Sequence, residues 1–199
     1  MNLSRNPSQT TRRRNYGSME RALLNRELGY AYLTIPKAAN TSIKMALLPT
    51  IGRTREDIHL DEPIARSIHN PDAGLYELTT RKAVQKSEVN FVFTCVRNTW
   101  SRLESCYLDK IKRNFLPSYA DYSFSPKTTF CEFVDTICET PDEECEIHFR
   151  PQTRFLYDKG RFLPDLVLRT EALNSHWEVL RCYFKNQHGV DIPKIARFG

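Results

Sequence analysis

The chain has 199 residues, of which 40% are hydrophobic and 11% aromatic. This content suffices for one well-buried core, and the length is too short for two comfortable domains, so we expect a single folded domain. The formal charge of +5 is concentrated in residues 1–28, where six arginines face only Glu20 and Glu27, which leaves +1 for the remainder. We therefore expect a basic, disordered leader over 1–28, a folded domain over 29–199, and no nucleic-acid binding by the folded part.

The sequence also bears on location and redox chemistry. It contains no run of about 18 apolar residues and no apolar segment of a secretory signal, so we expect a soluble, cytoplasmic protein without a transmembrane segment. The six cysteines form no C-x-x-C pair, and a zinc site is not expected. Cys95 and Cys106 lie in apolar contexts typical of reduced, packed thiols. Only Cys138 and Cys145, on either side of an acidic turn, are placed to form a disulfide.

The first predicted element is an apolar strand over 31–35, which ends at Pro36 because proline cannot donate to a strand ladder. An amphipathic helix is expected to open at Thr41. A strand, a loop with Lys37 and a helix N-terminus together direct N–H groups, a positive dipole end and an ammonium to one place, which predicts an anion site. The G-x-x-x-x-G-K-[ST] loop is absent, because Lys37 precedes Thr41 and no glycine is present. An ATP site of that type is therefore disfavoured.

The middle of the chain alternates between strand and helix. Residues 52–70 show no strong period and are predicted to be mostly loop, whereas residues 74–85 are predicted to form a helix. A strand over 90–96 is apolar on both faces, as in a covered parallel sheet, and Asn98 is expected to cap the helix that follows. Arg97 then stands at the carboxyl end of a strand, the edge at which open α/β sheets bind ligands.

The second half of the chain continues this alternation. Residues 112–130 mix aromatic and polar side chains with proline and are predicted to form a long functional loop. A capping box at Thr129 predicts a helix with an apolar stripe. A short strand over 165–168 and a helix over 171–184, ended by Gly189, follow. The pattern indicates an α/β fold with a mainly parallel central sheet.

Three motifs in this order resemble those of sulfotransferases, which use 3′-phosphoadenosine 5′-phosphosulfate (PAPS). The Pro-Lys-x-x-x-Thr-Ser run over 36–42 resembles their 5′-phosphosulfate loop. Residues 97–107 resemble the Arg-x-Pro-x-x-Arg-x-x-Ser-x-Tyr signature for the 3′-phosphate, with Thr99 in place of the proline, a small change at a first helical turn. Residues 148–152, His-Phe-Arg-Pro-Gln, are similar to the His-Trp-x-Pro-Gln element of the carbohydrate, or family 2, sulfotransferases.

Residues 168–173 and 192–195 extend the resemblance over nearly all of the folded part. It implies a P-loop-NTPase-like three-layer fold. It also implies in-line transfer of the sulfuryl group of PAPS, as co-substrate, to a hydroxyl of an acceptor, expected to be a glycan, with no metal required. Two departures stand out. Ala39-Asn40 replaces a glycine often found in the loop, so the backbone must approach the sulfate without it. The chain stops at Gly199 where relatives continue, which predicts either a more open nucleotide pocket or a shortened chain.

The resemblance assigns roles to residues around the co-substrate. Lys37 is expected to stabilise charge on the leaving 5′-phosphate, and Arg97 and Ser105 are expected to select the 3′-phosphate. The residues expected to hold the 5′ end are Lys37, Ala38, Ala39, Asn40, Thr41 and Ser42.

The acceptor hydroxyl needs a base. In relatives with a histidine base, that residue lies between the first helix and the arginine-bearing strand, so His69 is the first choice and His59 the reserve. His148, also a catalytic candidate, is expected to orient the acceptor or the nucleotide. Should neither histidine serve as the base, a carboxylate such as Asp72 or Glu77 is the next choice.

Two other functions remain open on the sequence. A nucleotide-dependent phosphotransferase is disfavoured because the Gly-Lys-[Ser/Thr] loop and a magnesium carboxylate at a strand end are missing. The other is a non-catalytic module with a transferase-like fold that binds polyanions.

Overall fold

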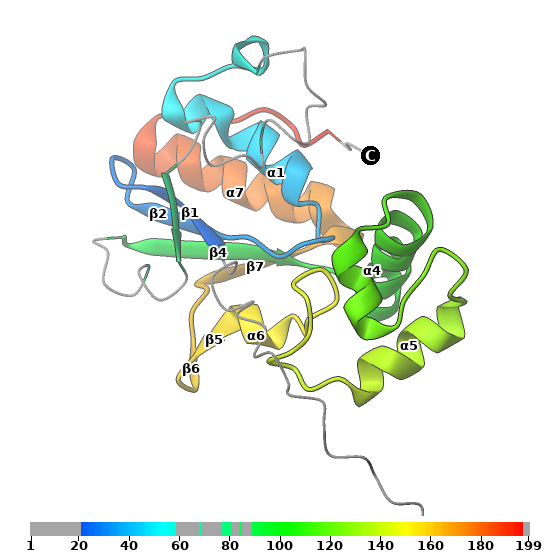
Figure 1. Ribbon diagram of the computed structural model, residues 1–199. Coiled ribbons are helices and arrows are strands. Elements are labelled where there is room, and N and C mark those ends of the chain that lie inside the picture. The colour runs from blue at the N-terminus through cyan, green and yellow to red at the C-terminus, as the bar shows by residue number, and fades with distance from the viewer. Residues whose placement is uncertain (1–20, 59–67, 69–76, 81–83, 85–88, 197–199) are drawn as a thin grey trace, which may run out of the picture.

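The computed structural model describes residues 21–58, 68, 77–80, 84 and 89–196 of the chain. Its centre is a five-stranded sheet of order β3-β1-β2-β4-β7 (Figure 1). The strands are β1 (Arg21–Asn25), β2 (Tyr30–Leu33), β3 (Glu77–Thr80), β4 (Phe91–Val96) and β7 (Leu166–Arg169). β2, β4 and β7 pair in parallel, whereas β1 runs antiparallel to both β2 and β3. Every strand of this sheet except β1 thus points the same way, and the predicted mixed α/β fold with a mostly parallel sheet is confirmed.

Alternate side chains along the strands enter two different cores, as the two-residue period of a strand requires. Leu23, Tyr32 and Phe93 face one side, where they pack with α1 (Asn40–Leu47) and α7 (Leu173–His188). Ala22, Ala31 and Leu33 face the other side. Figure 1 shows α1 and α7 over one face and α6 (Thr153–Leu156) with the small β5–β6 hairpin (Tyr157–Asp158 and Arg161–Phe162) on the opposite face.

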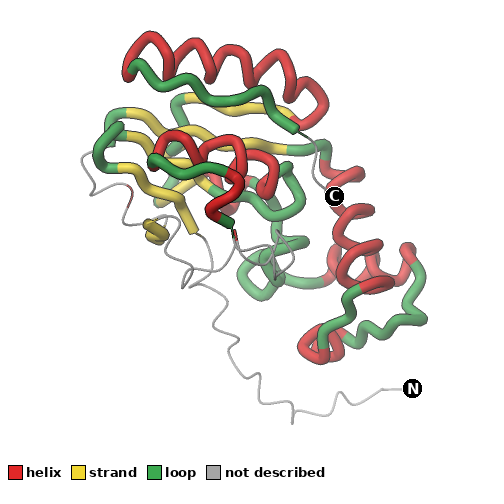
Figure 2. The backbone as a smooth tube through the Cα atoms, turned by 90° about the horizontal axis from the view of Figure 1, so that it is seen from above, coloured by secondary structure: helices red, strands yellow, loops and turns green. Residues whose placement is uncertain are grey.

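A second, aromatic core lies beyond the carboxyl edge of the sheet. It is built by α4 (Thr99–Cys106), which continues as the π-helix η5 (Tyr107–Arg113), by α5 (Phe130–Glu139) and by the 3₁₀-helix η6 (Pro117–Tyr122). In Figure 2 this group of helices lies beside the sheet rather than over it. The remaining short 3₁₀ elements are η2 (Leu48–Ile51), η3 (Arg55–Asp57) and η7 (Thr170–Ala172).

Several predicted elements are confirmed in detail. Asn98 caps α4 by accepting from the amides of Trp100 and Ser101, and Thr129 forms a capping box with Glu132 at the start of α5. Gly189 ends α7 with a φ of 69°. All six cysteines are free, so no bridge joins the pair considered for a disulfide.

Three predictions need correction. The expected leader over 1–28 ends too late, because β1 already belongs to the sheet at Arg21–Asn25. Residues 77–80 form a strand and not part of a helix, in keeping with the β-branched pair Thr79-Thr80 and with pairing to β1. Residues 112–130 are not an open loop, since Tyr119 and Phe124 are buried in the second core, where large aromatic side chains remove much apolar surface from water.

The other predictions for the leader and for 59–76 fall largely outside the described residues, and these include His59, His69 and Asp72. Glu77, the reserve carboxylate, forms an ion pair with Arg26 at 3.0 Å on the surface. Within the described part of the chain, no helix combines the length and apolar character needed to cross a membrane.

Candidate active site

A cleft of about 1080 Å³ opens where β2, β4 and β7 end. Its walls come from the segments that follow these strands and from α1, α4 and η5. A smaller cavity of about 290 Å³ adjoins it, shares Thr170, Glu171 and Leu173 with it, and reaches Ile195. The predicted site residues that line the cleft are Lys37, Ala39, Asn40, Thr41, Ser42, Arg97, Ser105 and His148. Three motifs separated along the chain therefore meet at one place.

Ala38 differs from its neighbours in the loop. Its side chain is buried against Ile35 and Phe155, and its amide donates to the carbonyl of Ile35 at 3.3 Å. Ala38 therefore anchors the loop to the core and presents no side chain to the cleft.

The loop between β2 and α1 turns without glycine. Lys37 has a φ of 66° and Ala39 a φ of 57°, both in the left-handed region, where a side chain costs about 1–2 kcal/mol. Ala39 is the N-cap residue of α1 and supplies no side-chain capping bond, and residues 39–42 line the cleft. The N-terminus of α1, the end of a helix that favours anions, thus faces the cleft.

Lys37 points to a carboxylate that the sequence did not single out. Its Nζ donates to Oδ2 of Asp109, Lys110 Nζ lies 3.2 Å from the same oxygen, and Asn114 donates to Oδ1 at 2.6 Å. Burial acts to raise the pKa of Asp109, but the bonds from Lys37 and Asn114 and the two ammonium charges outweigh it and hold that pKa well below its usual range. The ionised carboxylate therefore keeps two ammonium groups together at the cleft wall.

Arg97 is held at the end of β4 by its backbone. Its N–H donates to Oε1 of Gln152 at 2.9 Å, and Nε2 of Gln152 donates back to its carbonyl at 2.7 Å. The guanidinium of Arg97 donates to the carbonyl of Lys37 at 3.3 Å, and Ser105 lines the same cleft from α4. Glu171, after β7, accepts the amide of Asn98 at 2.6 Å and so fixes the start of α4. The glutamine and the glutamate of the predicted motifs thus position the arginine.

Arg102, the second arginine of the 97–107 motif, is buried with 2% exposure. It donates to three backbone carbonyls: that of Pro36 at 2.9 Å, that of Arg150 at 2.9 Å and that of Ile147 at 3.2 Å. Burial lowers the pKa of Arg102 to about 10, so the guanidinium stays charged at neutral pH. This side chain joins the loop that carries Lys37 to the segment that carries His148.

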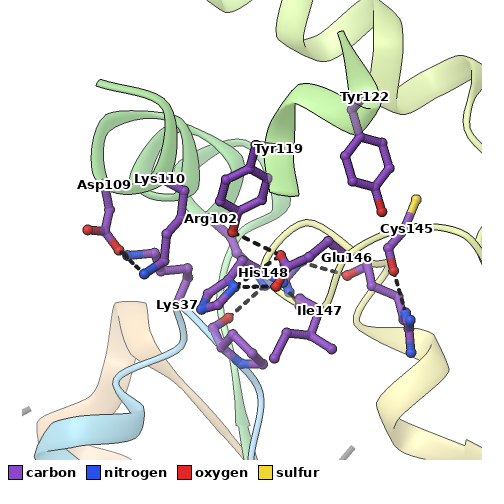
Figure 3. A network of polar contacts seen from close by, with 12 residues as sticks. Lys37, Arg102, Asp109, Lys110, Tyr119, Tyr122, Cys145, Glu146, Ile147 and His148 are labelled. Carbon is purple, nitrogen blue, oxygen red and sulfur yellow. Dashed lines mark hydrogen bonds and ion pairs between the residues drawn. The ribbon is translucent and has the colours of Figure 1, made fainter. Parts of the chain in front are cut away.

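His148 lies in a network of polar contacts shown in Figure 3. Its Nδ1 is 2.8 Å from Oε1 and 3.0 Å from Oε2 of Glu146, and its amide donates to Oε2 at 2.9 Å. The hydroxyl of Tyr119 donates to the same carboxylate at 3.3 Å. Burial acts to raise the pKa of Glu146, but the bonds and charge of His148 and the bond from Tyr119 leave this pKa below its ordinary value. Burial, followed by the charge of Glu146, raises the pKa of Tyr119, so its hydroxyl remains a donor.

The donor set of the cleft suits an anionic ligand. Lys37 and Lys110 meet at Asp109 close to the N-terminus of α1, and Arg97 and Ser105 line the same cleft from the second motif. Charge-assisted bonds from such groups are the strong contacts for phosphate and sulfate oxygens. Among the residues that the structure describes, no group of three or more His, Cys, Asp or Glu side chains is placed to hold a metal ion.

Comparison with known proteins agrees with this geometry. A protein-family model described as the sulfotransferase family matches residues 20–197. This range includes every residue that the structure describes. No curated protein sequence and no solved structure matched. The match spans all three motifs around the cleft and starts just before β1. The enzymes of this family use PAPS, and membership of it implies a P-loop-like fold. The chain therefore belongs to the sulfotransferase family of the carbohydrate type.

Proposed function

We propose that the protein transfers the sulfuryl group of PAPS to a hydroxyl of a carbohydrate acceptor by in-line displacement, with a histidine as base. One observation carries the proposal: the two anion-binding motifs, 36–42 and 97–107, and the third motif, 148–152, share one cleft although they are far apart in sequence. Family membership supports a sulfotransferase over the phosphotransferase and over a binding module without turnover.

The roles of the residues follow from where charge develops. Lys37 at the amino end of α1 stabilises the charge that grows on the departing 5′-phosphate oxygen, and Thr41 and Ser42 hold its other oxygens with loop amides. Arg97 and Ser105 bind the 3′-phosphate. No metal is needed in this scheme, because Lys37 and the helix N-terminus supply the positive potential.

The size of the cleft supports an acceptor of some bulk. A single small-molecule site occupies about 300–1,000 Å³. The cleft, at about 1080 Å³, slightly exceeds this range, and a second cavity of about 290 Å³ shares lining residues with it. A nucleotide and a sugar hydroxyl therefore have room to meet beside Lys37.

Thermal melting with nucleotides tests the class of enzyme. We expect 3′-phosphoadenosine 5′-phosphate to stabilise the protein without magnesium, by about 2.7 kcal/mol at 100 times its dissociation constant. Stabilisation by magnesium–ATP alone would instead support a phosphotransferase. Transfer of label from PAPS to a panel of glycans, lipids and small alcohols then tests the acceptor, and transfer to lipids or small alcohols alone would overturn the carbohydrate assignment.

A further inference from the structure

We propose that His148 is the base for the acceptor hydroxyl and that Glu146 is the positioning residue that orients it. The inference rests on the proposed sulfuryl transfer. It departs from the expectation that a histidine of the 59–76 region is the base and that His148 only orients ligands.

The tautomer of His148 follows from its partner. The depressed pKa of Glu146 keeps its carboxylate ionised at neutral pH, and an ionised carboxylate only accepts hydrogen bonds. Nδ1 of His148, 2.8 Å from Oε1, must therefore carry the proton and donate it. A neutral imidazole with a proton on Nδ1 has its lone pair on Nε2. The free lone pair is the one that a base needs.

Glu146 holds the backbone of His148 as well as its imidazole ring. Its carboxylate accepts from the ring and from the amide of His148, and it is itself held by the hydroxyl of Tyr119 at 3.3 Å. Between the two residues, the carbonyl of Ile147 accepts from Arg102 at 3.2 Å. Ring, backbone and carboxylate are thus immobilised together, as a pre-organised base requires.

The other side of the imidazole belongs to the cleft. The side chain of His148 is 25% exposed, lines the cleft, and no described residue forms a hydrogen bond with Nε2. Figure 3 shows the ring on the Lys37 side of Glu146. The base and the cation for the leaving group therefore open into the same space. The titratable and charged groups around the pair, taken from each packed element, are Lys37, Arg102, Cys106, Asp109, Lys110 and Tyr119.

The proton and the electrons balance in one displacement. Nε2 of His148 takes the proton of the acceptor hydroxyl while an oxygen lone pair forms the new bond to sulfur. The bond between sulfur and the bridging oxygen breaks, and its electron pair leaves with the 5′-phosphate beside Lys37. The products are a sulfate ester and 3′-phosphoadenosine 5′-phosphate, and the imidazolium, stabilised by Glu146, returns its proton to water.

The pH dependence of kcat in Glu146→Gln tests the pair. A neutral base is required, so kcat rises with pH along an acid limb. Loss of the anionic partner favours the neutral imidazole, so we expect the acid limb to move to lower pH while the plateau falls about tenfold or more. Nitrogen NMR of the ring should report a proton on Nδ1 in the wild type and a weaker preference for this tautomer in the variant. Glu146→Asp should restore part of the rate.

His148→Gln should lower kcat by about 10²–10⁴-fold and remove the acid limb, with the affinity for 3′-phosphoadenosine 5′-phosphate retained. Glu143→Gln is the matched control, because Glu143 lies only three residues before Glu146 but pairs with the exposed Arg154 at 2.8 Å, and it should behave as wild type. Tyr119→Phe, which removes one hydroxyl only, gives a milder perturbation of the same carboxylate should Glu146→Gln not fold.

Two results would overturn the assignment while leaving the transferase intact. One is an acid limb and ring signals that do not move in Glu146→Gln or Tyr119→Phe. The other is loss of the limb in His69→Ala with its survival in His148→Gln. By contrast, a wild-type protein that binds 3′-phosphoadenosine 5′-phosphate yet transfers no label to any acceptor would overturn the proposed function, and the base with it.

Discussion

Two segments supply walls of the cleft, and different kinds of interaction hold them in place. The 36–42 loop is set by its backbone, with left-handed conformations at Lys37 and Ala39 and a helix N-terminus that follows directly. The 145–152 segment is set by side chains, because Glu146 fixes His148 and Gln152 fixes the end of β4. Anion binding needs converging N–H groups, which a backbone supplies, whereas a base needs one defined tautomer, which a side-chain partner supplies.

Arg102 is the direct link between the two walls. It donates to Pro36 at the start of one segment and to Ile147 and Arg150 in the other, across 66, 45 and 48 residues of sequence. The relative position of Lys37 and His148 therefore depends on a residue whose hydrogen bonds go to backbone carbonyls of neighbouring residues.

Arg102→Gln should have the largest effect, because it separates the walls. A glutamine cannot reach all three carbonyls, and buried acceptors left without donors cost about 1–3 kcal/mol each, so we expect the free energy of unfolding to fall by about 3 kcal/mol or more. Chemical denaturation measures it. Arg154→Gln, which removes an exposed arginine paired with Glu143, should cost less than about 1 kcal/mol. Similar small losses in both variants would show that Arg102 does not join the walls.

Lys37→Ala removes a cation from the 36–42 loop and leaves the 145–152 segment unchanged. The charge that Lys37 offsets grows in the transition state, so we expect kcat to fall by about 100-fold or more while nucleotide affinity falls less. Steady-state kinetics and calorimetric titration separate the two quantities. Lys127→Ala, at an exposed lysine outside the cleft, is the control. An equal loss in kcat and in affinity would reduce Lys37 to a binding residue.

Arg97→Ala should alter selection rather than turnover. Removal of a charge-assisted contact costs about 1.5–3 kcal/mol, so the preference for 3′-phosphorylated over plain adenosine nucleotides should collapse. Competition binding of the two nucleotides measures the preference. Lys37→Ala should keep it, and a mutant at Arg97 that still discriminates as well as the wild type would contradict the assignment to the 3′-phosphate.

Ala39→Gly should give the smallest change, and of opposite sign. Glycine adopts the φ of 57° without strain, and this relief of about 1–2 kcal/mol is partly offset by the flexibility of glycine in the unfolded chain. We expect the free energy of unfolding to rise by about 0.5–1 kcal/mol. Ala46→Gly, buried in the interior of α1, should instead lower it by about 1 kcal/mol or more. Equal destabilisation by both would mean that Ala39 is not strained.

The sequence predicted the parts of the site that depend on short-range order. The strand, loop and helix around Lys37, the strand before Arg97 and the Asn98 cap are local patterns, and each lies where expected. β1 was missed because the composition of the leader is dominated by arginine, although Ala22-Leu-Leu24 is an apolar run within it. His69 lies outside the described residues, so its predicted role stays a prediction.

The residues that the sequence did not reveal contact partners that are far away in sequence. Asp109 meets Lys37 across 72 positions, and Gln152 meets Arg97 across 55. No periodicity encodes such a meeting, because it depends on how the elements pack. Glu146 is a different case, since it lies two residues before His148, and an acidic residue so close to a candidate base was a signal that could have been used.

The π-helix η5 makes the geometry of the cleft depend on the number of residues in the segment 107–113. A segment with hydrogen bonds five residues apart holds one more residue per turn than an α-helix needs, and such segments recur at functional sites. Deletion of a single residue within 107–113 would remove this extra residue, let α4 continue as a regular helix and change the directions of the side chains inside the segment. Asp109 and Lys110 lie inside this segment and line the cleft, so such a deletion would redirect their side chains without any substitution.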